Sequence, residues 1–395
     1  MKKTICLVSI LIFTSFCGSK QDVVEKITED GIEVVINHLE PYKIKGEPSL
    51  LSLLKEITID TEVNIFAELG VTDVLDFCVD SEGHLYLRTR RSGQDLIYKF
   101  DSEGKFQLSF GREGQGPGEL MSPKSLIENE EGHIEISDNA NRRQYFFDKN
   151  GELIREISLP QDIERANILS DGNILAIKRH FNRDAGRGER PIVLSRKDFA
   201  EIKILHPGKS IPNLMLAKTI NPLELYMDFN TFRVSKNLIY IGNYGRDEYE
   251  FLVYDIEGKM IRKIRKEYTT VKVPNQIKEE LLNMAEELNL NDVLKKVKFP
   301  EFYPPFQFFF LDDMGRLYVM THERGKNPSS FIYDIFNSDG YYIARIELDN
   351  YGVSPYSANE LPLPLSVESK NNRIYILREK ESGYKELVVY RMKWE

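Results

Sequence analysis

Residues 111–120 read Gly-Arg-Glu-Gly-Gln-Gly-Pro-Gly-Glu-Leu, a stretch unusually rich in glycine. It is followed by a predicted strand-turn-strand unit that ends in Ser-Asp-Asn-Ala-Asn-Arg-Arg at residues 137–143. Glycine admits the tight, positive-φ turns that a crossover between two neighbouring sheets requires. The stretch therefore predicts a junction between two structural repeats.

A hairpin pattern recurs along the chain on both sides of this junction. Each copy has a polar turn with Gly or Asn, followed by a segment in which apolar and polar residues alternate. Six copies lie at residues 80–87, 128–136, 170–177, 235–241, 312–319 and 369–376. Gly and Asn tolerate positive φ at a turn, and alternation is typical of a half-buried strand. Repetition at this spacing indicates a repeat architecture.

A second hairpin follows most of these copies. Residues 97–106 match residues 144–153, and the pattern returns at 251–260 and 332–341. Two hairpins give four strands per repeat, which is the blade of a β-propeller. We predict an all-β, six-bladed β-propeller of four-stranded antiparallel blades. A segment from Ile57 to Phe66 is expected to add an N-terminal strand that helps to close the ring.

The glycine-rich junction, the stretch from Asp138 to Arg143 and the Asp-x-x-Gly turns resemble those of propellers built from NHL repeats. More narrowly, residues 31–37, Glu40-Pro41 and residues 302–306 are similar to the exported six-bladed β-propeller family of bacteria. The resemblance covers nearly the whole mature chain, although the third repeat lacks the Asn-Arg signature and the sixth lacks the glycine-rich junction. It implies an exported propeller and no particular activity, because propellers carry unrelated functions.

The N-terminus has the layout of a bacterial export signal, with Lys2-Lys3 followed by an apolar run from Ile5 to Phe13. Residues 14–17 resemble a lipobox that ends at Cys17, although Phe16 stands where a small residue is usual. The alternatives are an ordinary signal peptide cleaved a few residues later and an unprocessed anchor. We expect residues 1–17 to be a lipoprotein-type signal peptide, residues 18–46 a tether and extended segment, and residues 47–395 the propeller.

Composition narrows the classes of partner. The chain of 395 residues carries 53 Lys and Arg against 62 Asp and Glu, a net charge of −9. Such a balance argues against a broad phosphate-binding surface, and we expect no nucleic acid partner. Outside the signal region Cys78 is the single cysteine. No intramolecular disulfide is therefore possible in the mature chain, and a buried cysteine is the expected state.

Three segments interrupt the repeated hairpin pattern for the longest stretches: the glycine-rich junction, residues 179–190 and about 268–305. We expect all three to lie on one face of the ring. In the last of these, apolar residues at three- and four-residue spacing after Pro274 predict a small helical insertion at about 274–298, between blades 4 and 5. The spaced residues are Ile277, Leu281, Met284, Ala285 and Leu288. This stripe could pack on the propeller or dock a partner.

Each loop after a second strand contains at least one arginine. The candidate ligand-binding residues are Arg90, Arg142, Arg143, Arg179, Arg246, Arg324 and Arg378. A ring of guanidinium groups around a central channel would suit a carboxylate, a phosphate or an acidic glycan. Acidic residues occur in the same loops, so these arginines could instead pair between blades or face solvent.

No catalytic motif emerges from the sequence. The six histidines show no metal-ligand spacing, and neither a Gly-x-Ser-x-Gly elbow nor a phosphate-binding Gly-Lys-Ser/Thr ending is present. We therefore expect no catalytic residue, no metal site and no cofactor.

The prediction is an exported propeller, tethered to a membrane of the cell envelope by a lipid, that acts as a binding or scaffold module. Its partner would be an envelope protein, a peptide or an anionic small molecule. The alternative is an enzyme, a lyase or hydrolase with its active site at the channel mouth. An enzyme should show a metal or a convergent His, Asp and Arg cluster there, whereas a scaffold should expose an apolar patch.

Overall fold

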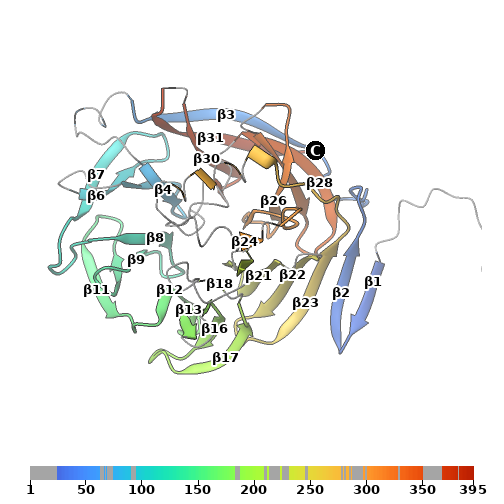
Figure 1. Cartoon of the computed structure of the whole chain (residues 1–395). Helices are drawn as coiled ribbons and strands as arrows, with labels where there is room; N and C mark the ends of the chain where they lie inside the picture. Colours follow the sequence, from blue (N-terminus) through green and yellow to red (C-terminus); the bar gives the residue numbers. More distant parts are fainter. Residues whose placement is uncertain are drawn as a thin grey trace, which may run out of the picture.

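A computed structural model shows short antiparallel sheets arranged as a ring (Figure 1). The structure describes residues 25–62, 66, 68, 74–89, 95–182, 187–208, 211–212, 223–224, 231–244, 248–276, 279, 282–283, 286, 297–298, 300–327, 330–349, 367–380 and 382–395. Within these residues, six sheets form six blades, each with four strands ordered from the centre of the ring to its rim. The predicted six-bladed β-propeller is confirmed.

The first three blades follow the chain closely. Blade 1 contains β4 (Val74–Val79), β5 (Leu85–Thr89), β6 (Asp95–Phe100) and β7 (Phe106–Arg112). Blade 2 contains β8 (Pro123–Glu128), β9 (Ile134–Asp138), β10 (Arg143–Phe147) and β11 (Leu153–Ser158). Blade 3 contains β12 (Ile163–Ile168), β13 (Ile174–Lys178), β16 (Ile192–Ser195) and β17 (Glu201–His206).

The last three blades complete the ring. Blade 4 contains β20 (Phe232–Ser235), β21 (Leu238–Tyr244), β22 (Tyr249–Asp255) and β23 (Met260–Lys266). Blade 5 contains β25 (Phe308–Leu311), β26 (Leu317–Arg324), β27 (Ser330–Phe336) and β28 (Tyr342–Asp349). Blade 6 contains β29 (Val367–Lys370), β30 (Arg373–Glu379), β31 (Lys385–Trp394) and, from the other end of the chain, β3 (Leu51–Asp60).

Short strands lie outside the blades. They are β14 (His180–Asn182), β15 (Arg187–Glu189) and β18 (Ile211–Pro212) in one small sheet, and β19 (Leu223–Glu224) with β24 (Val297–Lys298) in another. Of the insertion expected at 274–298, the structure describes helical positions at residues 275–276, 279, 282–283 and 286. The five residues of its predicted apolar stripe lie outside the described residues. Among the residues that are described, no helix is long and apolar enough to cross a membrane.

The ring closes by pairing the two ends of the propeller. Strand β3 runs antiparallel to β31 from Leu51 opposite Trp394 to Asp60 opposite Glu386. The strand expected from Ile57 to Phe66 therefore exists, but it begins six residues earlier, because it matches the full length of β31. Phe66 instead packs in the core between blades 6 and 1. This pairing covers an edge that an open ring would expose.

The N-terminal segment adds a hairpin to the rim of blade 4. Strands β1 (Glu25–Glu29) and β2 (Ile32–Asn37) are joined by a turn at Asp30 and Gly31, both with positive φ, and β2 runs parallel to β23. Asn37 is fully buried at the join. Its side-chain amide donates to the carbonyl oxygens of Arg265 and Gly340, and its side-chain oxygen accepts from the N–H of Tyr342. One residue thus links the hairpin to blades 4 and 5.

The glycine-rich junction at residues 111–120 contacts the turn that follows it in the sequence, at residues 138–143. The buried carboxylate of Asp138 accepts from the N–H groups of Met121 and Ser122 at 2.5 and 3.0 Å. The amide of Asn141 donates to the carbonyl oxygens of Gly114 and Glu119. Gly111 has φ +71°, and a Cβ there would lie 2.6 Å from the side chain of Leu120. The two sequence signals are therefore the two halves of one crossover between blades 1 and 2.

We predict that Ile59→Ala in β3 lowers the free energy of unfolding by about 2–5 kcal/mol, because Ile59 is 5% exposed and packs between blades 6 and 1. Leu54→Ala in the same strand is the control, since Leu54 is 64% exposed and should change stability by at most about 0.5 kcal/mol. Urea denaturation of both variants measures the difference. Equal effects would show that β3 does not carry the closure of the ring.

Candidate functional site

A cavity of about 270 Å³ occupies the centre of the ring. Residues of all six innermost strands line it: β4, β8, β12, β20, β25 and β29. At one end the lining reaches the turns that follow these strands, through Asn129, Glu130, Asp312 and Asp313. Pockets for small ligands usually enclose about 300–1,000 Å³, so this cavity suits a small molecule.

The wall combines apolar and charged groups. Leu126, Phe232, Phe310 and Leu311 supply apolar surface. Charged side chains also border the space, namely Arg165, Arg233, Glu128, Glu368 and Lys370. Apolar walls with a few fixed polar groups are the usual composition of a ligand site.

Arg165 is the most unusual of these residues. It lies on β12, and its guanidinium stacks on the ring of Phe232 at 4.8 Å. Its Nε is buried with no hydrogen-bond partner, and among the described residues the side chain forms no ion pair. Burial lowers the pKa of the guanidinium to about 10, so that the group still carries its charge at neutral pH.

The carboxylates closest to Arg165 already have partners. Asp76 receives two hydrogen bonds from Arg88, at 2.8 and 3.1 Å. Glu164 pairs with Arg190, whose Nε donates at 2.8 Å. Glu135 accepts from the amide of Gln144. The Oε2 of Glu135 has no partner of its own, but none of these carboxylates forms an ion pair with Arg165, so its guanidinium is available to a ligand.

Arg233 supplies a second, firmly held charge. It lies on β20, donates to the hydroxyl of Thr231 at 3.1 Å and to the carbonyl oxygen of Phe232 at 2.8 Å, and stacks over Phe308 at 5.0 Å. Its positive charge lowers the pKa of Glu368. Arg233 therefore contributes to the field of the cavity from a fixed position.

Glu368 lies on β29, and its Oε2 is buried without a hydrogen-bond partner. Burial raises the pKa of this carboxyl to about 8, against the opposing effect of the Lys370 ammonium. Lys370 is itself paired with Glu128 at 2.8 Å. A carboxyl that titrates near neutral pH inside a cavity is typical of functional sites.

Cys78 also borders the cavity, as a buried free thiol. Burial raises its pKa well above the usual value, mainly through desolvation. The thiol is therefore protonated at neutral pH, which is the state expected of a structural cysteine rather than of a nucleophile.

None of the five predicted loop arginines that the structure describes lines this cavity. Arg143 pairs with Glu156 and Arg378 with Glu386, each at 2.7 Å within its own blade. The guanidinium of Arg324 stacks on the ring of Phe331 at 4.0 Å. Arg90 and Arg246 lie outside the described residues. The predicted ring thus divides into separate local contacts wherever the structure describes it.

Arg142 and Arg179 are the two predicted residues that the structure brings together, at the boundary of blades 2 and 3. Arg142 has φ +52°, and its Nε and Nη2 are buried without a hydrogen-bond partner. Burial and the charge of Arg179 both lower its pKa. Arg179 is 65% exposed at its side chain and lies 3.7 Å from Glu164. The two guanidinium groups therefore lie near each other, with Glu164 beside Arg179.

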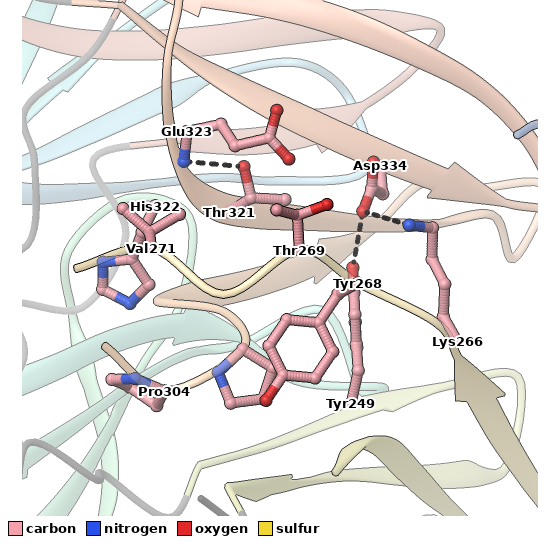
Figure 2. A pocket seen from close by; sticks show the side chains of 11 residues that line it. Tyr249, Lys266, Tyr268, Thr269, Val271, Pro304, Thr321, His322, Glu323 and Asp334 are labelled. Carbon is pink, nitrogen blue, oxygen red and sulfur yellow. Dashed lines mark hydrogen bonds and ion pairs between the residues drawn. The ribbon is translucent and has the colours of Figure 1, made fainter. Parts of the chain in front are cut away.

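Figure 2 shows a smaller pocket between blades 4 and 5, on the same face as those loops. At its base Asp334 accepts from Tyr249 at 3.1 Å and from Arg345 at 3.0 Å and lies 3.4 Å from the ammonium of Lys266. His322 stacks on Tyr303 with ring centroids 4.2 Å apart. The space is only about 10 Å³, which is room for about one water molecule. We interpret this group as a clamp between blades.

Among the residues that the structure describes, no group of three His, Cys, Asp or Glu side chains lies close enough together to hold a metal ion. His180 lies on β14, outside the blades, whereas His322 lies on β26 of blade 5 and borders the pocket of Figure 2.

The sequence contained a signal for the charged cavity residues that the loop argument missed. In each blade the first two strands form a hairpin, and its residue pairs can be counted from the turn. Glu368 and Arg233 each lie in the third pair from the turn, and Arg165 lies in the fourth. Each charge interrupts an innermost strand that should be apolar. Aligning the repeats at their turns would have placed these charges at neighbouring depths of the channel.

A family model described as a 6-bladed beta-propeller matches residues 73–206. A protein from Bacteroides fragilis that is described as exported has the same fold, at 12% identity and TM-score 0.50, over 91% of this chain and 99% of its own. No curated protein matches the sequence.

Two further solved structures match less closely. A member of the DUF4221 family from Bacteroides vulgatus aligns at 13% identity and TM-score 0.49, over 88% of this chain and 100% of its own. A gluconolactonase from Xanthomonas campestris aligns at 10% identity and TM-score 0.38, over 82% and 87%. At these values the similarities give no information on activity.

We predict that Glu368→Gln stabilises the ligand-free protein increasingly as pH rises. The folded carboxyl keeps its proton up to about pH 8, whereas the unfolded one loses it near the ordinary pKa of a glutamate, 4.5, so its contribution to stability is lost as pH rises through this window. The melting temperature of the variant relative to the native protein should therefore increase between about pH 5 and about pH 9. Glu257→Gln, at an exposed position, is the control. A difference independent of pH would contradict the assignment.

Proposed function

We propose that this chain is an exported binding protein that takes a small organic anion into its central channel, where Arg165 contacts the anionic group. The observation that carries the proposal is a charged guanidinium that borders the cavity, whose buried Nε has no hydrogen-bond partner and which forms no ion pair among the described residues. An unpaired buried charge costs a protein several kcal/mol, about 3–5 when a partner is removed from a buried pair. A ligand that supplies a carboxylate would offset this cost through charge-assisted hydrogen bonds.

The architecture of the channel supports a binding role. The charged side chains lie on strands rather than loops, and the strands belong to sheets that pack against both neighbours. Sites on rigid elements hold their geometry before the ligand arrives, which reduces the entropy lost on binding. Phe232 further restricts Arg165 by stacking on its guanidinium.

The enzyme alternative has one supporting observation. Glu368 has a raised pKa of about 8, which is suited to general acid–base catalysis near neutral pH. A lyase or hydrolase that uses Glu368 would lose turnover in Glu368→Gln while still binding its substrate. A binding protein should show no turnover of a bound anion in either form.

We also infer that the protein is held in the cell envelope by a lipid on Cys17. The Lys2-Lys3 and apolar layout of the leader supports export, and the Bacteroides fragilis protein that shares the fold is described as exported.

Arg165→Gln should abolish anion binding with little loss of stability, because the side chain leaves behind no hydrogen-bond or ion-pair partner and loses only its stacking on Phe232. The comparison variant is Arg88→Gln, which leaves the buried Asp76 without its ion-pair partner and should lower the free energy of unfolding by about 3–5 kcal/mol. Titration calorimetry with succinate, phosphate and glucuronate should show at least about tenfold weaker binding to the Arg165 variant. Equal affinities of the variant and native protein for all three probes would remove Arg165 from the site.

Cys17→Ser is expected to move the protein from the membrane to the soluble fraction, because the acyl chains would have no attachment point. Cys6→Ser changes a cysteine of the same leader and should leave the distribution unchanged. Fractionation followed by immunoblotting measures both. A Cys17 variant that stays with the membrane would exclude this anchor.

A further inference from the structure

The channel has a guanidinium on one wall and a carboxyl on the opposite wall. Arg165 belongs to blade 3 and Glu368 to blade 6, and these two blades face each other across the ring (Figure 1). Both side chains border the same cavity at neighbouring depths, since Arg165 belongs to the fourth residue pair from its turn and Glu368 to the third. A ligand that reaches from one wall to the other therefore meets a cation at one end and a carboxyl at the other.

Each of these two groups has one buried polar atom without a partner, although the Glu368 carboxyl also accepts from the backbone N–H of Val79. The Nε of Arg165 has no acceptor, and the Oε2 of Glu368 has no donor. The ammonium nearest to Glu368 belongs to Lys370 and is engaged by Glu128 at 2.8 Å. A ligand could therefore place an anionic group beside Arg165 of blade 3 and a hydrogen-bond donor beside Glu368 of blade 6.

The surface between the two walls is apolar. Leu126, Phe232, Phe310 and Leu311 border the space. Aromatic and aliphatic side chains of a ligand gain free energy when such surface excludes water, at about 25 cal/mol for each Å² buried. The cavity of about 270 Å³ limits the ligand to a small molecule.

We propose that the ligand is a zwitterion, an apolar amino acid or a short peptide, with its carboxylate on Arg165, its ammonium on Glu368 and its side chain on the apolar wall between them. This inference rests on the proposed anion site at Arg165 and specifies what binds there. The positive charge of Arg165 on blade 3 attracts the carboxylate of the ligand, and the carboxyl of Glu368 attracts its ammonium. The two walls therefore also fix the direction in which the ligand lies.

Binding in this mode releases one proton. In the empty cavity the carboxyl of Glu368 is protonated at neutral pH, and an ammonium beside it stabilises the carboxylate, so the proton passes to solvent. The charged and titratable groups around this carboxyl are Lys370, Glu128, Arg233 and the thiol of Cys78, with Asp312 and Asp313 on the adjacent lining. Proton release therefore reports the ammonium contact separately from the carboxylate contact.

The test uses purified full-length protein and three forms of each probe. Every natural amino acid and dipeptide is screened by thermal shift, and those that stabilise are compared with their N-acetyl and C-amide derivatives by calorimetry in two buffers of different ionisation enthalpy. The free zwitterion should bind at least about tenfold more tightly than either blocked form. It should release about one proton, and Glu368→Gln should abolish that release.

Three outcomes would overturn the proposal. An N-acetyl form that binds as tightly as the zwitterion removes the ammonium contact but leaves the anion site at Arg165 standing. A C-amide form that binds equally well excludes the carboxylate contact and, with it, the proposed function. If no amino acid or dipeptide stabilises the protein, the zwitterion is excluded. The anion site then depends on whether succinate, phosphate or glucuronate binds through Arg165.

Discussion

The pairing of β3 with β31 is the constraint on which the rest of the propeller depends. Ten residues from the start of the ring lie beside ten from its end, so the last blade exists only when both ends of the ring are in place. The cores between blades are continuous around the ring, and the cluster that holds Ile59 also includes Phe77 of blade 1 and Leu387 of blade 6. Closure thus fixes the relative positions of the six innermost strands and the diameter of the channel.

This constraint explains how the channel can retain charges without partners. A side chain on an innermost strand cannot move away from the axis without displacing its sheet, because each sheet is packed on both faces. Arg165 is further held by Phe232, and Arg233 by Thr231. The charged side chains therefore stay at the channel wall, although moving into solvent would lower the free-energy cost of keeping them there. Such departures from a satisfied interior are typical of functional sites.

The repeat was predictable because turns and strands recur in similar chemistry. Asp80, Asn129 and Asp312 each accept from the N–H groups two and four residues ahead, so one local hydrogen-bond pattern marks blades 1, 2 and 5. The channel site was harder to predict, since Arg165 and Glu368 are single residues far apart in sequence, and only the register of the strands brings them to similar depths. The loop arginines were the more visible pattern, but the described ones make mainly local contacts.

The hairpin β1–β2 was missed for a different reason. Asp30-Gly31 between two short segments is a hairpin signal, but β2 also pairs with β23, more than two hundred residues away. Its parallel pairing has no local signature. The buried Asn37, which joins this hairpin to blades 4 and 5, is likewise an ordinary polar residue until the fold surrounds it.

That hairpin also determines how the ring would sit beside a bilayer. The first described strand, β1, begins at Glu25 on the edge of the sheet that contains blade 4, at the rim of the ring rather than on either of its faces (Figure 1). Cys17 precedes Glu25 by eight positions, so a lipid on Cys17 would lie at most roughly 28 Å from this strand at about 3.5 Å per residue. A disc attached to a bilayer so near its edge would leave both ends of the channel open to solutes that diffuse along the surface.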